Sequence, residues 1–110
     1  MMTITIDQKY ADLLGTFGNV QDAFDLAIQR YTIEQITAKI ATLRQQAEMY
    51  AAKYQCDYTT FVKRMATDET FAKKIESDVE ATWELDLIEW EFSHKGIEDW
   101  TQKLQSILLE

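Results

Sequence analysis

Hydrophobic and polar residues alternate at the start of the chain, and hydrophobic residues recur at helical spacing almost everywhere else. Residues 2–6, Met-Thr-Ile-Thr-Ile, have the period of two that predicts a short strand. A lone strand leaves its backbone hydrogen-bonding groups unpaired, and no second segment has this alternation. We therefore expect this strand to pair antiparallel with the same strand of a second copy.

Two helices are predicted in the rest of the first half. Asp7 is placed to cap a short helix that ends between Gly15 and Gly18. Asn19 is placed to cap a long helix over residues 20 to about 54. The phase of the apolar pattern slips near residue 32, which predicts a change of packing partner. Beyond the slip, three- and four-residue steps predict a coiled-coil-like seam at Ile33, Ile36, Ile40, Leu43, Ala47, Tyr50 and Tyr54.

The second half is predicted to be helical from Asp57 onward. Asp57 is placed to cap a short helix, and Thr67 or Asp68 to cap the helix that follows. An apolar stripe then continues to the end of the chain. It allows one helix over residues 68–109, or two helices that break at residues 93–96, where a glycine interrupts the pattern.

Around residues 83–92 the predicted helix is apolar on two sides. The two sets lie opposite each other, Trp83, Leu87 and Trp90 on one side and Leu85, Ile88 and Phe92 on the other. A helix with two apolar faces is normally covered on both. In a chain of 110 residues we expect one apolar face to pack against the protein's own core and the other to pack against a second chain.

The composition supports a mainly α fold. The chain has no proline and only three glycines, which excludes collagen-like and loop-dominated architectures. Its length suits a single domain, and its hydrophobic content of 46% is enough for a packed core. We therefore expect one short N-terminal strand followed by long helices.

The charge divides the chain into two regions. The formal net charge is −8, which disfavours a general nucleic-acid coat or a binder of anionic membranes. Residues 1–55 carry five basic against six acidic side chains, and residues 56–110 carry six against thirteen. We interpret residues 1–55 as a region for dimerisation and DNA binding, and residues 56–110 as an acidic, Trp-rich helical region that binds a partner.

Few residues offer catalytic or metal chemistry. Nucleophilic hydrolysis needs an activated Ser or Cys beside a base, and the chain has one Cys, one His and no glycine elbow around its serines. Glu91 and His94 have the Glu-x-x-His spacing of di-iron bundles, but such a site needs further buried glutamates, so a helix-surface histidine is favoured. We expect a protein that is not an enzyme and holds no metal or cofactor.

Features of secreted and membrane proteins are also missing from the sequence. Cys56 has no second cysteine with which to form an intrachain disulfide. No apolar run approaches the roughly 18 residues of a membrane-spanning helix, and the first residues lack the pattern of a signal peptide. We expect a reduced, cytoplasmic protein that does not bind membranes.

The aromatic residues of the second half allow two interpretations. Tryptophans are typical core fillers of a small helical protein. With surrounding carboxylates they also suit a hot-spot patch for a basic protein. The acidic balance favours the second interpretation, and the predicted partner-binding residues are Trp83, Leu87, Trp90, Trp100 and Leu104.

The first half holds the predicted dimer and DNA contacts. Paired strands would present Thr3 and Thr5 to a major groove, and the helix start at Asn19 would hold a phosphate. The alternative is that both threonines lie on the solvent-exposed face of a dimer strand and contact no DNA, since no Lys or Arg precedes Lys9. Dimerisation is assigned to Ile4, Ile6, Phe24 and Ile28.

The order of strand, short helix, glycine-containing turn and longer helix in residues 2–33 resembles the ribbon-helix-helix fold. Residues 3–7 look like its strand, and residues 13–20 look like its inter-helix turn. The core face of its second helix is matched by Phe24, Ala27, Ile28 and Tyr31. Proteins of this fold are intertwined dimers, and many are antitoxins of type II toxin–antitoxin pairs with an acidic C-terminal part that binds the toxin.

The resemblance implies a homodimeric antitoxin that neutralises a cognate basic toxin and regulates its own operon by binding operator DNA. A structural helical-bundle adaptor without DNA binding is the alternative from another class. The two differ in whether operator DNA and a toxic partner are bound at all.

Overall fold

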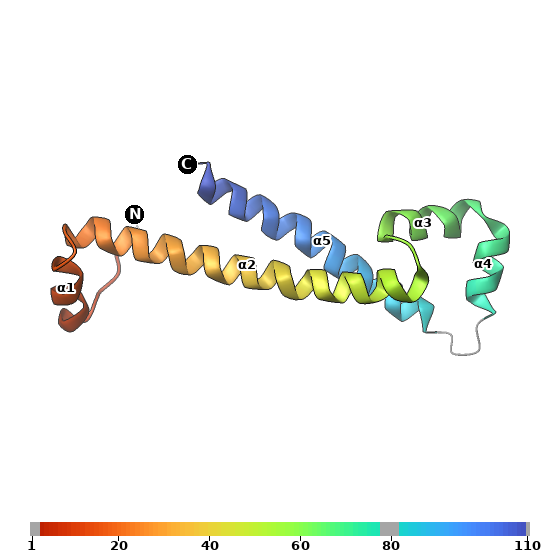
Figure 1. The fold of residues 1–110 in the computed structure, drawn as a ribbon, viewed down its shortest axis with the longest axis horizontal. Coiled ribbons are helices and arrows are strands. Elements are labelled where there is room, and N and C mark those ends of the chain that lie inside the picture. Colours follow the sequence, from red (N-terminus) through yellow and green to blue (C-terminus); the bar gives the residue numbers. More distant parts are fainter. Residues whose placement is uncertain (1–2, 78–81, 110) are drawn as a thin grey trace. The chain divides into compact units, whose positions relative to one another are not determined.

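A computed structural model describes residues 3–77 and 82–109, which form five helices (Figure 1). The helices are α1 (Gln8–Gly15), α2 (Val20–Tyr54), α3 (Tyr58–Thr67), α4 (Glu69–Glu76) and α5 (Trp83–Leu108). The prediction of a mainly α protein is confirmed. Neither described range contains a strand, and residues 3–7 lie outside the helices of the single chain. Because the expected strand needs a second copy for its hydrogen bonds, its pairing stays a prediction.

Side-chain caps begin three of the helices where the sequence predicts them. Asn19, Asp57 and Asp68 each accept a hydrogen bond from the backbone N–H three residues further on, at 3.2, 2.7 and 3.1 Å. The cap of α4 is therefore Asp68 and not Thr67. Asp7 precedes α1 as predicted, but its side chain makes no capping hydrogen bond.

Residues with positive φ lie where α1 and α2 end. Gly18, between the two helices, has a φ of +133°, which glycine adopts without a steric cost. Gln55 follows α2 directly and has a φ of +59°, in the left-handed region that commonly terminates a helix. The predicted extent of the long helix, residues 20 to about 54, is confirmed.

The helix break in the second half differs from both predicted arrangements. α4 ends at Glu76 and α5 begins at Trp83, so residues 68–109 are neither one helix nor two that break at residues 93–96. The Ser77 hydroxyl donates to the Lys74 carbonyl oxygen at 3.1 Å, a local hydrogen bond of the kind that competes with helix continuation. Val79, part of the predicted stripe, lies outside the described residues.

Gly96 serves helix packing and does not break α5. A Cβ added to Gly96 would lie 2.8 Å from Leu43 Cδ1, closer than real Cβ atoms approach. The absence of a side chain lets α2 and α5 come together at this point, which is a recurrent use of glycine.

The chain forms two compact units, which we call the first unit (residues 1–35) and the second unit (residues 36–110). They divide within α2, close to the phase slip in the apolar pattern near residue 32. This geometric division differs from the charge division at residue 55, because residues 36–54 belong to the same compact unit as α3, α4 and α5.

An aromatic core holds the second unit together. Trp90 is 1% exposed and Phe61 is fully buried. The Trp90 ring stacks on Tyr54 with centroids 5.8 Å apart, and Phe61 meets Phe71 edge to face at 5.7 Å. Such aromatic pairs stabilise a core beyond the area they bury.

Within the second unit, α5 runs antiparallel to the last part of α2 (Figure 1). Positions 53, 50, 46 and 43 of α2 meet positions 86, 89, 93 and 96 of α5, in that order. Both series take the three- and four-residue steps of a coiled-coil seam. The seam predicted on α2 is confirmed over the second unit, where Ile36, Ile40, Leu43 and Tyr50 are buried.

Candidate interaction surfaces

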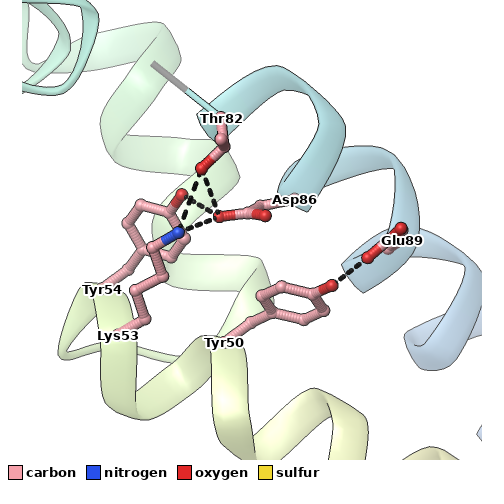
Figure 2. A network of polar contacts seen from close by, with 6 residues as sticks. All are labelled: Tyr50, Lys53, Tyr54, Thr82, Asp86 and Glu89. Atoms are coloured by element: carbon pink, nitrogen blue, oxygen red, sulfur yellow. Dashed lines mark hydrogen bonds and ion pairs between the residues drawn. The ribbon is translucent and has the colours of Figure 1, made fainter. Parts of the chain in front are cut away.

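A polar network joins the last turns of α2 to the start of α5 (Figure 2). Lys53 Nζ donates to Asp86 Oδ2 at 2.5 Å, and the Tyr54 hydroxyl donates to the same oxygen at 2.6 Å. One turn further on, the Tyr50 hydroxyl donates to Glu89 Oε2. These bonds fix the rotation of α5 about its axis, and so decide which of its faces stays open to other molecules.

The electrostatics of this network suit neutral pH. Burial opposes ionisation of the Asp86 carboxyl, but the hydrogen bonds from Lys53 and Tyr54 outweigh it and hold its pKa below the usual range. The hydrogen bond to the Glu89 carboxylate, together with burial, raises the pKa of Tyr50 to about 12. Asp86 is therefore anionic and Tyr50 protonated at neutral pH, which is the state both bonds require.

Trp90, predicted as a partner-binding residue, is instead a core residue of the second unit. Its indole lies among Tyr50, Tyr54 and Phe61 and is 1% exposed, so a partner cannot reach it while the unit is folded. Leu87 is half-buried and packs against the same core. For Trp90 the core-filler interpretation is therefore the correct one.

Three other predicted contact residues of α5 keep partial access to solvent. Trp83 is half-buried at the start of the helix. Trp100 is also half-buried, and Lys103 Nζ lies 4.4 Å from its ring centroid. Leu104 lines a groove of about 430 Å³ with Ile40, between α2 and α5. The structure does not gather these side chains into one patch with Trp90.

The most exposed apolar surface on α5 lies on its third face, which faces neither α2 nor the aromatic core. Leu85, Ile88 and Phe92 are 61%, 63% and 69% exposed, and we call them the outer stripe. Their spacing of three and four residues puts them on one line along the helix. The side chains at Glu84 and Glu91 follow one edge of that line.

The first unit exposes most of its apolar side chains. None of its described residues, 3–35, is buried. Its large exposed apolar residues are Ile4, Tyr10, Leu13, Phe17, Val20, Leu26, Ile28 and Tyr31. Of the predicted dimer residues, Ile4 and Ile28 are 61% and 48% exposed, whereas Ile6 and Phe24 are half-buried. Exposed apolar surface of this extent is typical of a protein–protein contact.

The residues predicted to contact DNA are accessible in the first unit. Thr3, Thr5 and Asn19 are all exposed. The Asn19 side chain accepts the N–H of Asp22, so only the remaining N–H groups at the start of α2 are open to a phosphate. The structure leaves both interpretations of the threonines open.

The Glu-x-x-His spacing does not assemble a metal site in the described residues. His94 stacks on Tyr58 with ring centroids 4.7 Å apart, and its Nε2 lies 3.4 Å from Glu98 Oε1. Glu91 pairs instead with Lys95 at 2.8 Å. Over residues 3–77 and 82–109 no group of three or more His, Cys, Asp or Glu is placed to hold a metal ion.

Comparisons with known proteins do not place the chain in a family. No family model matches the chain, and neither a curated protein nor a solved structure matches it. Among the residues that the structure describes, no helix is long and apolar enough to cross a membrane. The ribbon-helix-helix resemblance therefore rests on the residue pattern of residues 2–33 alone.

The sequence showed the outer stripe as an apolar face but did not select it as a contact surface. The signal that separates the two faces is side-chain size. Trp90 offers the larger apolar area and has four aromatic neighbours on α2 and α3, so burying it stabilises the fold most. The face with Leu85, Ile88 and Phe92 is then left outside.

Proposed function

We propose that this chain is a non-enzymatic interaction protein of the antitoxin type. It forms a homodimer through its first unit and binds and neutralises a basic toxin protein with its acidic second half. The observation that carries this proposal is the first unit, where none of residues 3–35 is buried and eight large apolar side chains are exposed. A second copy laid against this surface supplies the core that the single chain lacks.

The dimer contact has two parts. Residues 3–6, outside the helices of one chain, pair with the same residues of the second copy and so satisfy their backbone groups. Ile4 and Ile6 then face the interior of the dimer together with Phe24 and Ile28 of α2. The resemblance of residues 2–33 to the ribbon-helix-helix pattern supports this arrangement.

The charge of the second half supports a basic partner. Residues 56–110 carry thirteen acidic side chains against six basic ones. A surface of this sign attracts positively charged proteins and repels acidic ones, which sets the choice of partner and the rate of association. Neutralisation follows if the bound segment covers the working surface of the toxin.

Operator binding forms a separate part of the proposal. Thr3, Thr5 and the start of α2 at Asn19 are accessible for contacts with bases and phosphates. The adaptor alternative, without DNA, is favoured by one observation, the absence of Lys and Arg before Lys9, because phosphate contacts dominate affinity for DNA. A gel-retardation assay with the upstream DNA decides between them, and Thr3→Ala with Thr5→Ala should weaken a specific complex.

Co-expression tests the proposal as a whole. The protein is produced together with the product of the adjacent reading frame, and growth and co-elution on a sizing column are measured. We expect rescue of growth, a stable complex and a dimeric mass for the free protein. Ile28→Lys should give a monomer, whereas Leu109→Lys, at an 85% exposed position of the second unit, should leave the dimer intact. No rescue together with no complex would refute the antitoxin function.

A further inference from the structure

We infer that the outer stripe of α5 is the docking site for an amphipathic helix of the basic partner, anchored on Leu85, Ile88 and Phe92. The inference rests on the proposed function, because that function requires a basic partner. It adds the surface that is used and the kind of segment that binds there.

The stripe is not part of the core of the second unit. One neighbouring face of α5 is bonded to α2 through Asp86 and Glu89, and another holds Trp90 in the aromatic core. The side chains of the stripe remain 61–69% exposed, whereas Trp90 and Ser93 on the other faces of the same segment are buried. Apolar residues at three- and four-residue spacing are the anchors by which helices recognise one another.

The charges around the stripe indicate the sign of the partner. Residues 83–98 contain five acidic side chains and one basic one, Lys95. Asp86 and Glu89 are turned toward α2, which leaves three glutamates at seven-residue spacing along one edge of the stripe, at positions 84, 91 and 98. Lys95 lies on the same edge and pairs with Glu91 at 2.8 Å, so the edge carries three carboxylates and one ammonium and is acidic on balance. A helix with Lys or Arg along its matching edge gains electrostatic complementarity there, as do the partners of other acidic surfaces.

The same edge argues against a second copy of this chain as the occupant. Antiparallel pairing of two stripes brings like edges together, so two edges that each carry three carboxylates and one ammonium would lie against each other. Like charges in such positions disfavour association. The occupant is therefore a basic amphipathic helix of a different protein.

The test uses the full chain and two synthetic helical peptides with the same leucine stripe, one with lysines along its edges and one with glutamates. Binding is measured by fluorescence anisotropy at low and high salt. The stripe variant is Leu85→Ser with Ile88→Ser and Phe92→Ser. The matched control is Leu108→Ser, which is 59% exposed on the same helix. Circular dichroism verifies that both variants keep their helices.

Wild type and control should bind the lysine peptide, less tightly at high salt. The stripe variant should bind it at least about tenfold more weakly, since buried anchors carry most of the energy of an interface. The glutamate peptide should bind weakly to every form. Equal binding of the lysine peptide to wild type and stripe variant, equal binding of both peptides, or no binding at all overturns the inference. So does a drop in the mass of the free protein with the stripe variant, because a second copy would then be the occupant.

Failure of the inference and failure of the function give different results. If the stripe variant still rescues growth in the co-expression assay, the antitoxin function stands and the docking site lies elsewhere. If wild type does not rescue growth, the antitoxin function fails whatever the peptides show.

Discussion

The two units of this chain contain similar apolar side chains but place them differently. The second unit buries Trp90 and Phe61 almost completely, whereas the first leaves Phe17 83% and Leu13 60% exposed. In its described residues the second unit has four helical segments, residues 36–54 of α2 and the helices α3, α4 and α5, which surround a common core. Residues 3–35 of the first unit contain two, α1 and residues 20–35 of α2. Amphipathic helices therefore need enough neighbouring helices to bury their apolar faces, and two helices alone leave apolar surface exposed.

Local structure does not explain the difference. Asn19 caps the start of α2 in the first unit in the same way that Asp57 and Asp68 cap α3 and α4 in the second. Both units therefore contain properly started helices. What the first unit lacks is tertiary cover, and the dimer we propose supplies it.

The largest expected change in stability comes from replacing the buried aromatic residue of α5 and comparing it with an exposed one on the opposite side of the helix. Trp90→Ala should lower the free energy of unfolding by about 3–5 kcal/mol, because it leaves a cavity in a core that cannot collapse fully. Phe92→Ala, at a 69% exposed position two residues away, should change it by about 0.5 kcal/mol or less. Urea unfolding followed by circular dichroism measures both variants. Similar losses for the two would mean that the outer stripe is covered within the free protein.

A second pair of variants compares the glycines of the two units. Gly96→Leu should lower the free energy of unfolding by about 1–3 kcal/mol, because even a Cβ would lie 2.8 Å from Leu43 Cδ1. Gly15→Leu should cause no loss, since a Cβ there meets Val20 Cγ2 at an ordinary 3.6 Å and leucine favours helix. The same urea titrations measure both.

A double variant separates crowding from other effects of Gly96→Leu. Leu43→Ala makes room at the contact, so part of the lost stability should return when the two changes are combined. Additive losses would show that the contact between α2 and α5 is looser than 2.8 Å implies.

Features that depend on neighbouring residues were predictable from the sequence, and features that depend on distant contacts were not. Asn19 and Asp57 cap helices by bonding a backbone N–H three residues away, so the sequence alone placed both. The sequence alone does not show whether Gly96 breaks the helix or lets another helix approach, because its role depends on Leu43, which is far away in the sequence. The choice between Trp90 and the outer stripe likewise needed the packing of α5 on α2 and α3.

The smallest expected effect concerns pH and the polar network of the second unit. The folded protein holds the Tyr50 proton up to a pKa of about 12, whereas an unfolded tyrosine ionises near pH 10. The stabilisation from the Tyr50 hydroxyl is thus fully present below about pH 10 and is lost as the pH rises toward 12. At neutral pH, Tyr50→Phe should cost about 1 kcal/mol, the usual net value of one hydrogen bond.

The measurement is the difference in unfolding free energy between wild type and Tyr50→Phe as a function of pH. It should stay constant from neutral pH to about pH 10 and shrink above it, because only wild type has the raised pKa. A difference that stays constant up to pH 12 would place the Tyr50 hydroxyl in water, away from Glu89. The hydrogen bond from Tyr50 to Glu89 would then be absent, and with it one of the contacts that set the rotation of α5 and turn the outer stripe outward.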